Sequence, residues 1–256
     1  MTLRRLLPVL VLLAALAVPG CSSNGNGGRF VPEYGEAKTP ATQAERDLIR
    51  SRKLLEDFAE GMTSAFRFPR DVTVVAEECG EANAFYVPDE HKIQLCYELL
   101  AAERALFAKT GVQGAELDTE VFNSAVGTLY HEAGHALIGE LSLTFTGREE
   151  DVADQLAAYV LTNSEEDKAT LLSVANAYAL SAEETKSLDE LPFYDTHSLD
   201  QQRSVNFLCY LYGSDKTTFD HLVTDGYLNR DRADGCQNEY QQLVNGWSTL
   251  LAPHWK

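Results

Sequence analysis

Basic residues are scarce in this sequence. Its 256 residues include 21 Lys and Arg against 39 Asp and Glu, which gives a formal net charge of −18. A surface of this charge repels the phosphates of nucleic acids, so we expect no nucleic-acid partner. The hydrophobic content of 45% is too high for a disordered acidic chain. The composition therefore indicates a folded, acidic globular protein.

Long hydrophobic runs are also missing. No segment reaches the roughly 20 apolar residues of a membrane-spanning helix. The longest apolar run, residues 6–18, follows Arg4 and Arg5, which is typical of an export signal. Cys21 follows a small residue, as in the lipobox of bacterial lipoproteins. We therefore predict a signal peptide over residues 1–21 and lipidation of Cys21, with an ordinary secretory signal as the alternative.

The expected lipid on Cys21 would make the membrane a partner, because several acyl chains on one cysteine anchor a protein durably. Residues 22–43 begin with the polar, glycine-rich SSNGNGG, which is typical of a flexible tether. The folded domain is expected over residues 44–256. This organisation predicts an exported lipoprotein of the bacterial cell envelope, on the periplasmic face or in the outer membrane.

Few cysteines remain after Cys21, and none of them forms a CxxC pair, which argues against a cysteine-rich zinc site. An oxidising compartment favours disulfides, and four cysteines allow three connectivities. We predict that Cys79 pairs with Cys96 and that Cys209 pairs with Cys236. Free buried thiols are the alternative.

Hydrophobic periodicity predicts a mostly helical chain. Helices are expected over residues 44–66, 97–109, 117–141, 148–161, 165–180, 198–212 and 237–251. β-prone runs occupy residues 72–79, 83–87 and 92–99, and a turn at residues 88–90 separates the last two. The pattern predicts a single α+β domain with a small antiparallel sheet, in which residues 72–79 and 92–99 both lie.

The helix expected over residues 117–141 contains the sequence TLYHEAGHAL. His131 and His135 are four residues apart, so they lie on the same helix face and can share one tetrahedral metal ion. Glu132 follows the first histidine, where it can take a proton from a metal-bound water. This is the HExxH pattern of zinc peptidases, and it predicts one Zn²⁺ per chain. Two ordinary surface histidines are the alternative.

A catalytic zinc has a third protein ligand and one open position. The metzincin pattern HExxHxxGxxH is absent, because Ile138 and Leu141 replace its glycine and its last histidine. In gluzincins the third ligand is a glutamate on a following helix, often within ExxxD or ExxAD. The sequence GREEDVADQLAA fits both forms, with Glu150 as the expected ligand.

Asp154 lies one turn after Glu150, where it can accept a hydrogen bond from a ligand imidazole and fix its tautomer. Glu149 and Asp151 are competing candidates for the third ligand. A solvated helix N-terminus also favours acidic residues through the helix dipole, but it does not explain the EDVAD pattern.

A third histidine is a candidate for stabilising the oxyanion of the reaction. His197 lies in FYDTHSLDQQR, with Asp195 as its expected orienting partner and Arg203 as a cationic donor. Ordinary packing is the alternative for His197, and a structural salt bridge is the alternative for Arg203.

A strand beside the motif can offer its edge to an extended peptide substrate. We assign this role to residues 92–96, with Asn83 and Tyr86 lining the groove. The alternative for Asn83 and Tyr86 is that they are turn and core residues of a hairpin.

These motifs resemble gluzincin-type metallopeptidases and, more closely, an uncharacterised bacterial domain-of-unknown-function family of metallopeptidases. The similar segments are residues 78–86, 93–100, 131–141, 147–158, 197–215 and 236–247. The resemblance implies a zinc-peptidase fold with a gluzincin-like pair of active-site helices. It does not imply a particular substrate.

The sequence therefore predicts zinc-dependent hydrolysis of a peptide or protein substrate, with Glu132 as general base. The same chemistry on another substrate, such as the peptide bridges of a cell wall, is one alternative. The other is a non-catalytic envelope lipoprotein that serves as a binding or structural module, with or without zinc. Glu132 argues against a module, since a scaffold site needs no base beside its ligands.

Overall fold

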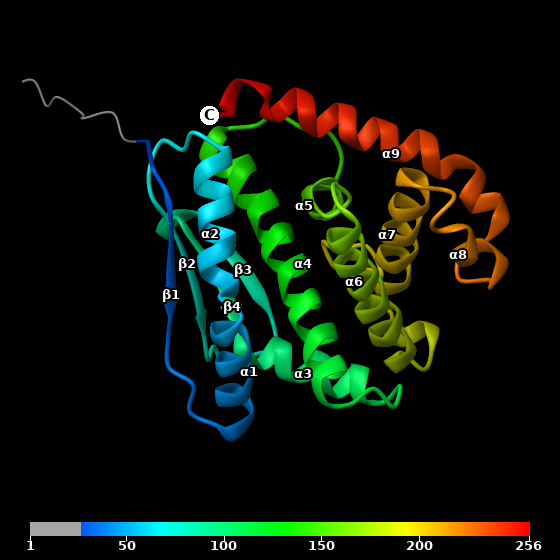
Figure 1. Ribbon diagram of the computed structural model, residues 1–256, viewed down its shortest axis with the longest axis horizontal. Helices are drawn as coiled ribbons and strands as arrows, with labels where there is room; N and C mark the ends of the chain where they lie inside the picture. The colour runs from blue at the N-terminus through cyan, green and yellow to red at the C-terminus, as the bar shows by residue number, and fades with distance from the viewer. Residues whose placement is uncertain (1–26) are drawn as a thin grey trace, which may run out of the picture.

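The computed structural model describes residues 27–256. The expected signal peptide, residues 1–21, and Cys21 lie outside the described residues. The described chain folds into one α+β domain in which helices pack with a single small sheet, as Figure 1 shows. The predicted fold class is confirmed.

The sheet is mixed, with strand order β1-β2-β4-β3. β1 (Phe30–Tyr34) and β4 (Lys92–Cys96) both run parallel to β2 (Val72–Glu77), whereas β3 (Ala84–Val87) is antiparallel to β4. The expectation of a wholly antiparallel sheet is therefore wrong. The chain leaves β2 for the edge strand β3 and reverses through a 3₁₀ turn at Pro88–Glu90, so β4 returns in the direction of β2.

Folded structure begins before residue 44, which corrects the predicted tether over residues 22–43. β1 pairs with β2 in the register Phe30 to Val72, and the Phe30 side chain is buried. α1 (Pro40–Ser51) begins with a proline in its first turn and with Thr39 as its N-cap. The glycine-rich start of the segment gave no signal of the short strand that follows it.

The single helix expected over residues 44–66 is two helices. Lys53 has the left-handed φ of 56°, which ends α1 and begins α2 (Leu54–Ala65). The other predicted helices are confirmed with shifted ends, and α8 was not predicted. The helices after α2 are α3 (Tyr97–Ala108), α4 (Gly114–Leu141), α5 (Glu149–Val160), α6 (Glu165–Glu184), α7 (Asp200–Ser214), α8 (Asp220–Thr224) and α9 (Arg230–Leu251). Of the helices within residues 27–256, none has the length and apolar character needed to span a bilayer.

α4 is the central element of the domain. In Figure 1 it runs between the sheet with α2 on one side and α5, α6 and α7 on the other. Leu129 and Leu137 on α4 are completely buried, as expected for a helix that is covered on several sides. The HExxH motif lies in the C-terminal half of this buried helix.

Both predicted disulfides are present. Cys79–Cys96 joins the segment after β2 to the end of β4, and Cys209–Cys236 joins α7 to α9. The two bonds close loops of 17 and 27 residues in the sequence. They connect neighbouring elements on opposite sides of α4.

α4 and α5 approach each other closely at Gly134, inside the HExxH motif. A Cβ atom added to Gly134 would lie 2.7 Å from the Cα of Ala153 on α5. No larger residue fits without moving one of the helices. The glycine therefore permits the backbone contact that brings α5 against the histidine-bearing face of α4.

We expect Gly134→Ala to lower the free energy of unfolding by about 1–3 kcal/mol, because the overpacked methyl group separates the helices. Gly61→Ala is the matched control, since Gly61 lies in α2 with nothing within 4 Å of its added Cβ. It should raise stability by roughly 0.5–1 kcal/mol through helix propensity. Urea denaturation measures both. Equal stabilisation by the two substitutions would contradict the close approach.

Candidate metal centre

Side chains from α4 and α5 converge beside the Gly134 contact. The Nε2 atoms of His131 and His135 lie 3.3 Å apart. Oε2 of Glu150, in the first turn of α5, lies 3.3 Å from Nε2 of His131 and 3.2 Å from Nε2 of His135. The structure therefore brings together the three residues that the sequence predicts as metal ligands.

The spacing of these three atoms fits a zinc ion. Zinc–ligand bonds of about 2.0–2.1 Å in a tetrahedron place neighbouring ligand atoms about 3.3 Å apart. The three measured separations are 3.3, 3.3 and 3.2 Å. Two imidazole nitrogens and one carboxylate oxygen are also a ligand set that zinc prefers. The residues present can hold the metal that the motif implies.

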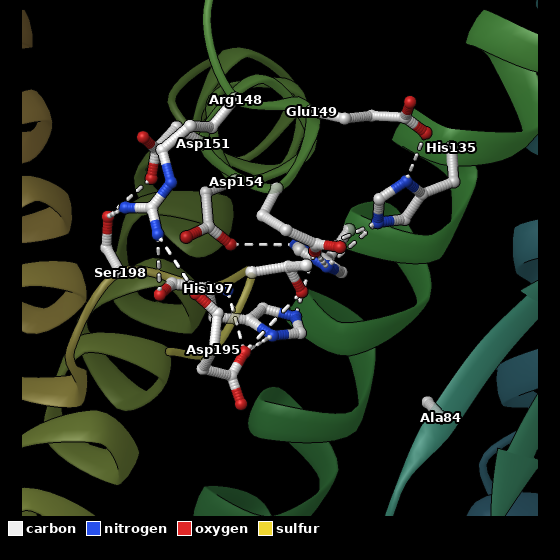
Figure 2. A network of polar contacts seen from close by, with 12 residues as sticks. Ala84, His135, Arg148, Glu149, Asp151, Asp154, Asp195, His197 and Ser198 are labelled. Atoms are coloured by element: carbon white, nitrogen blue, oxygen red, sulfur yellow. Dashed lines mark hydrogen bonds and ion pairs between the residues drawn. The ribbon is translucent and has the colours of Figure 1, made fainter. Parts of the chain in front are cut away.

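In His131 and His135 the other ring nitrogen, Nδ1, contacts a carboxylate. Nδ1 of His131 lies 2.8 Å from Oδ1 of Asp154, as the sequence predicts, and Nδ1 of His135 lies 2.8 Å from Oε1 of Glu149 (Figure 2). An ionised carboxylate only accepts hydrogen bonds, so both Nδ1 atoms donate. A neutral ring that donates from Nδ1 carries its lone pair on Nε2, where it can bind a metal ion, and this is the arrangement that orients ligand histidines in metal sites.

Asp154 is itself held by a buried arginine. Arg203 donates from Nε to Oδ2 of Asp154 at 2.8 Å and from Nη2 to Oδ1 at 2.6 Å. Burial opposes ionisation of Asp154, but the charge of Arg203 and the contact with His131 outweigh it and lower the pKa of Asp154 to about 2. The guanidinium also lies 4.1 Å from the ring centre of Tyr178. The structural salt bridge that was the alternative prediction for Arg203 is therefore present. It holds Asp154, which contacts the ligand candidate His131.

His197 joins the same cluster from the loop before α7. Its Nε2 lies 2.9 Å from Oε2 of Glu150, and its Nδ1 lies 2.9 Å from Oδ1 of Asp195, the predicted orienting residue. Ligand atoms of His131, Glu150 and His197 all lie within 4.8 Å of one another. The hydrogen bond to Glu150 raises the pKa of His197. The structure therefore places His197 at the centre and not in remote packing.

The N-terminus of α5 holds the loop that carries His197, a feature that sequence analysis missed. Arg148 donates to the carbonyl oxygens of Asp195 and His197 at 3.3 and 3.1 Å, and Ser198 donates to Asp151 at 2.7 Å (Figure 2). These contacts join residues almost 50 positions apart, so no local pattern could reveal them. Asp151, a competing ligand candidate, binds this loop instead.

Glu132 is buried beside the histidines. Only 6% of its surface is exposed, and burial raises the pKa of its carboxyl group. It lines an open cavity of about 660 Å³ together with His131, His135, Glu150 and His197. The general-base candidate and the ligand candidates therefore share one solvent-accessible space.

The strand that borders this cavity is β3. Asn83, Ala84 and Tyr86 line the cavity, and Figure 2 shows Ala84 on the strand beside α4. The expectation that residues 92–96 form the free edge is wrong, because β4 lies between β2 and β3. Tyr86 donates from its hydroxyl to Glu140 on α4 at 2.8 Å, which fixes β3 to the helix that carries the motif.

Arg203→Met should lower the free energy of unfolding by about 3–5 kcal/mol, since it leaves the buried Asp154 carboxylate without its counterion. Lys109→Met is the control, because Lys109 forms an exposed salt bridge with Glu184. It should leave the stability almost unchanged. Denaturant titrations at neutral pH measure both variants. A small effect of Arg203→Met would show that the Asp154 carboxylate does not depend on this pair.

Comparisons with known proteins agree with this geometry. The model of a protein family described as "Putative metallopeptidase" matches residues 34–251, which include every residue of the candidate centre. Neither the search of curated proteins nor the search of solved structures gave a match. Since the matched region covers most of the sequence, the chain belongs to this metallopeptidase family.

Proposed function

We propose that this protein is a gluzincin-like zinc peptidase whose metal is held by His131, His135 and Glu150. The observation that carries the proposal is the agreement of their three mutual separations with the edges of a zinc tetrahedron. The Nδ1 contacts of both histidines with carboxylates support it further. Three protein ligands leave a position open for solvent, as in catalytic sites.

Zinc bound there would supply Lewis-acid activation of a water molecule and of the scissile carbonyl group. Glu132 performs the proton transfers: its carboxylate takes a proton from the attacking water and passes it to the leaving amine. Its position directly after His131 and its place in the wall of the cavity support this role. A site that only bound zinc as a scaffold would need no such group.

His197 stabilises the negative charge that develops on the substrate carbonyl oxygen. Its 2.9 Å separation from Glu150 is a hydrogen-bond length and is shorter than a tetrahedral edge, which favours a donor over a fourth ligand. Asp195 accepts from Nδ1 and from the backbone N–H of His197, so it orients the ring.

The substrate is a peptide or protein in extended form. β3 is the edge strand of the sheet and borders the cavity, so a substrate segment can pair with it through backbone hydrogen bonds. Such pairing is independent of sequence. Selectivity must therefore come from side-chain cavities next to the scissile bond.

Glu132→Gln tests the proton transfer. The variant should keep one zinc per chain, measured by metal analysis, and lose about 10²–10⁴-fold in kcat on a peptide library. Glu116→Gln, on the exposed start of α4, is the control and should keep both zinc and activity. Full activity of Glu132→Gln would end its assignment as general base. Zinc without turnover in the wild type would favour the non-catalytic module.

Glu150→Ala and His197→Ala separate a ligand from a positioned donor. Glu150→Ala should lose stoichiometric zinc, because it removes one of three ligands. His197→Ala should retain zinc and lose about 10²–10³-fold in kcat, the effect of removing one oxyanion donor. Equilibrium dialysis against zinc measures the first effect, and steady-state kinetics measures the second. Loss of zinc from His197→Ala would make this residue a fourth ligand.

A further inference from the structure

A second cavity opens directly behind the proposed catalytic residues. It has a volume of about 500 Å³ and reaches from His131, Glu132 and His197 into the space between α3, α4, α6 and α7. Asn83 and Ala84 line it as well, so the cavity adjoins the edge strand β3 that would bind the substrate backbone. The position suits a side chain of the substrate residue next to the scissile bond.

Part of the wall of this cavity is apolar. Small and aliphatic side chains from α3, α6 and the loop before α7 line it: Leu99, Ala102, Leu106, Val174, Ala177 and Pro192. Walls of this kind pack well against the methylene groups of a long side chain. They would accept the stem of leucine, methionine, lysine or arginine equally well, so the polar groups decide between these residues.

Several polar groups of the cavity are acidic. Glu103 on α3 lines the cavity, and its Oε2 atom is buried and has no hydrogen-bond partner. Burial raises the pKa of this carboxyl group to about 7. Asp200, at the start of α7, lies in the same lining and accepts a hydrogen bond from Ser181. The Ser124 side chain hydrogen-bonds to the Glu103 carboxylate, but Oε2 of Glu103 has no partner. A buried carboxylate oxygen without a partner is costly, so it favours a cation that enters the cavity.

No basic side chain of the described chain satisfies this need. Arg203 also lines the cavity, but its guanidinium is already paired with Asp154 through two hydrogen bonds. Arg104, the neighbour of Glu103 in sequence, donates instead to Glu45 and Asp118. Oε2 of Glu103 therefore remains available to a ligand.

We propose that this cavity receives a lysine or arginine side chain of the substrate and that Glu103 is the residue that selects it. The inference rests on the proposed function, because the cavity begins at the catalytic residues. The aliphatic stem packs on the apolar walls, and the terminal cation pairs with Glu103. A neutral aliphatic side chain would leave the carboxylate unpaired, and this difference provides the selectivity.

Paired peptides test the proposal. Each pair differs by lysine or norleucine at one position flanking the scissile bond, so the aliphatic stem is kept and the ammonium is removed. We expect the wild type to prefer lysine by about 10–100-fold in kcat/KM, the value of one charged hydrogen bond. Glu103→Gln should reduce the preference to about threefold or less, because kcat/KM for the lysine peptides falls, and it should retain one zinc per chain.

Glu120→Gln is the matched control. Glu120 on α4 also has a buried carboxylate oxygen without a partner, but it does not line the cavity. This variant should keep the lysine preference of the wild type. The control separates an effect of the cavity from a general effect of removing a buried carboxylate. Both variants should fold, because an uncharged amide is less costly to bury than an unpaired carboxylate.

A binding measurement distinguishes failure of the specificity from failure of the catalysis. The same fluorescent peptide pairs are titrated with Glu132→Gln protein, with and without Glu103→Gln. Tighter binding of lysine peptides that depends on Glu103 would support the cavity assignment even if the wild type cleaved no peptide. Hydrolysis by the wild type without a basic preference would overturn the assignment and leave the peptidase proposal intact. A lysine preference that survives Glu103→Gln would also overturn it.

Discussion

The contact between α4 and α5 at Gly134 determines the geometry of the centre. Because Gly134 has no side chain, α4 packs directly against the backbone of α5 at Ala153. The two helices are therefore close enough for Glu150 to reach the histidines. A wider separation would leave a carboxylate and two imidazoles on separate surfaces. Helix packing, and not the motif alone, therefore creates a site whose spacing fits a metal.

Carboxylates then fix the orientation of every histidine in the cluster. Asp154, Glu149 and Asp195 each contact the Nδ1 atom of one histidine, and Arg203 holds Asp154 in turn. The three rings are consequently constrained through both of their nitrogens. This support comes from α5, from the loop before α7 and from α7 itself, so distant parts of the sequence determine the site together.

Local patterns were sufficient to predict most of the helices, the two disulfides and the residues that meet at the centre. Spacing on α4 identified His131 and His135, and the ExxxD pattern on α5 identified Glu150. The sheet was harder to predict, because strand direction depends on which strand occupies the edge. The break at Lys53 and the partners of Arg148 depend on backbone conformation and on contacts distant in sequence, which periodicity does not record.

β3 is only four residues long and forms the rim of the opening above Glu132. A strand of this length can align a short piece of another chain and no more. If peptides are cut here, they must arrive already unfolded over several residues, since a helix or a paired strand offers no free backbone groups. Intact compact domains would then resist cleavage except in their exposed loops, whereas damaged or incompletely folded chains would be readily accessible.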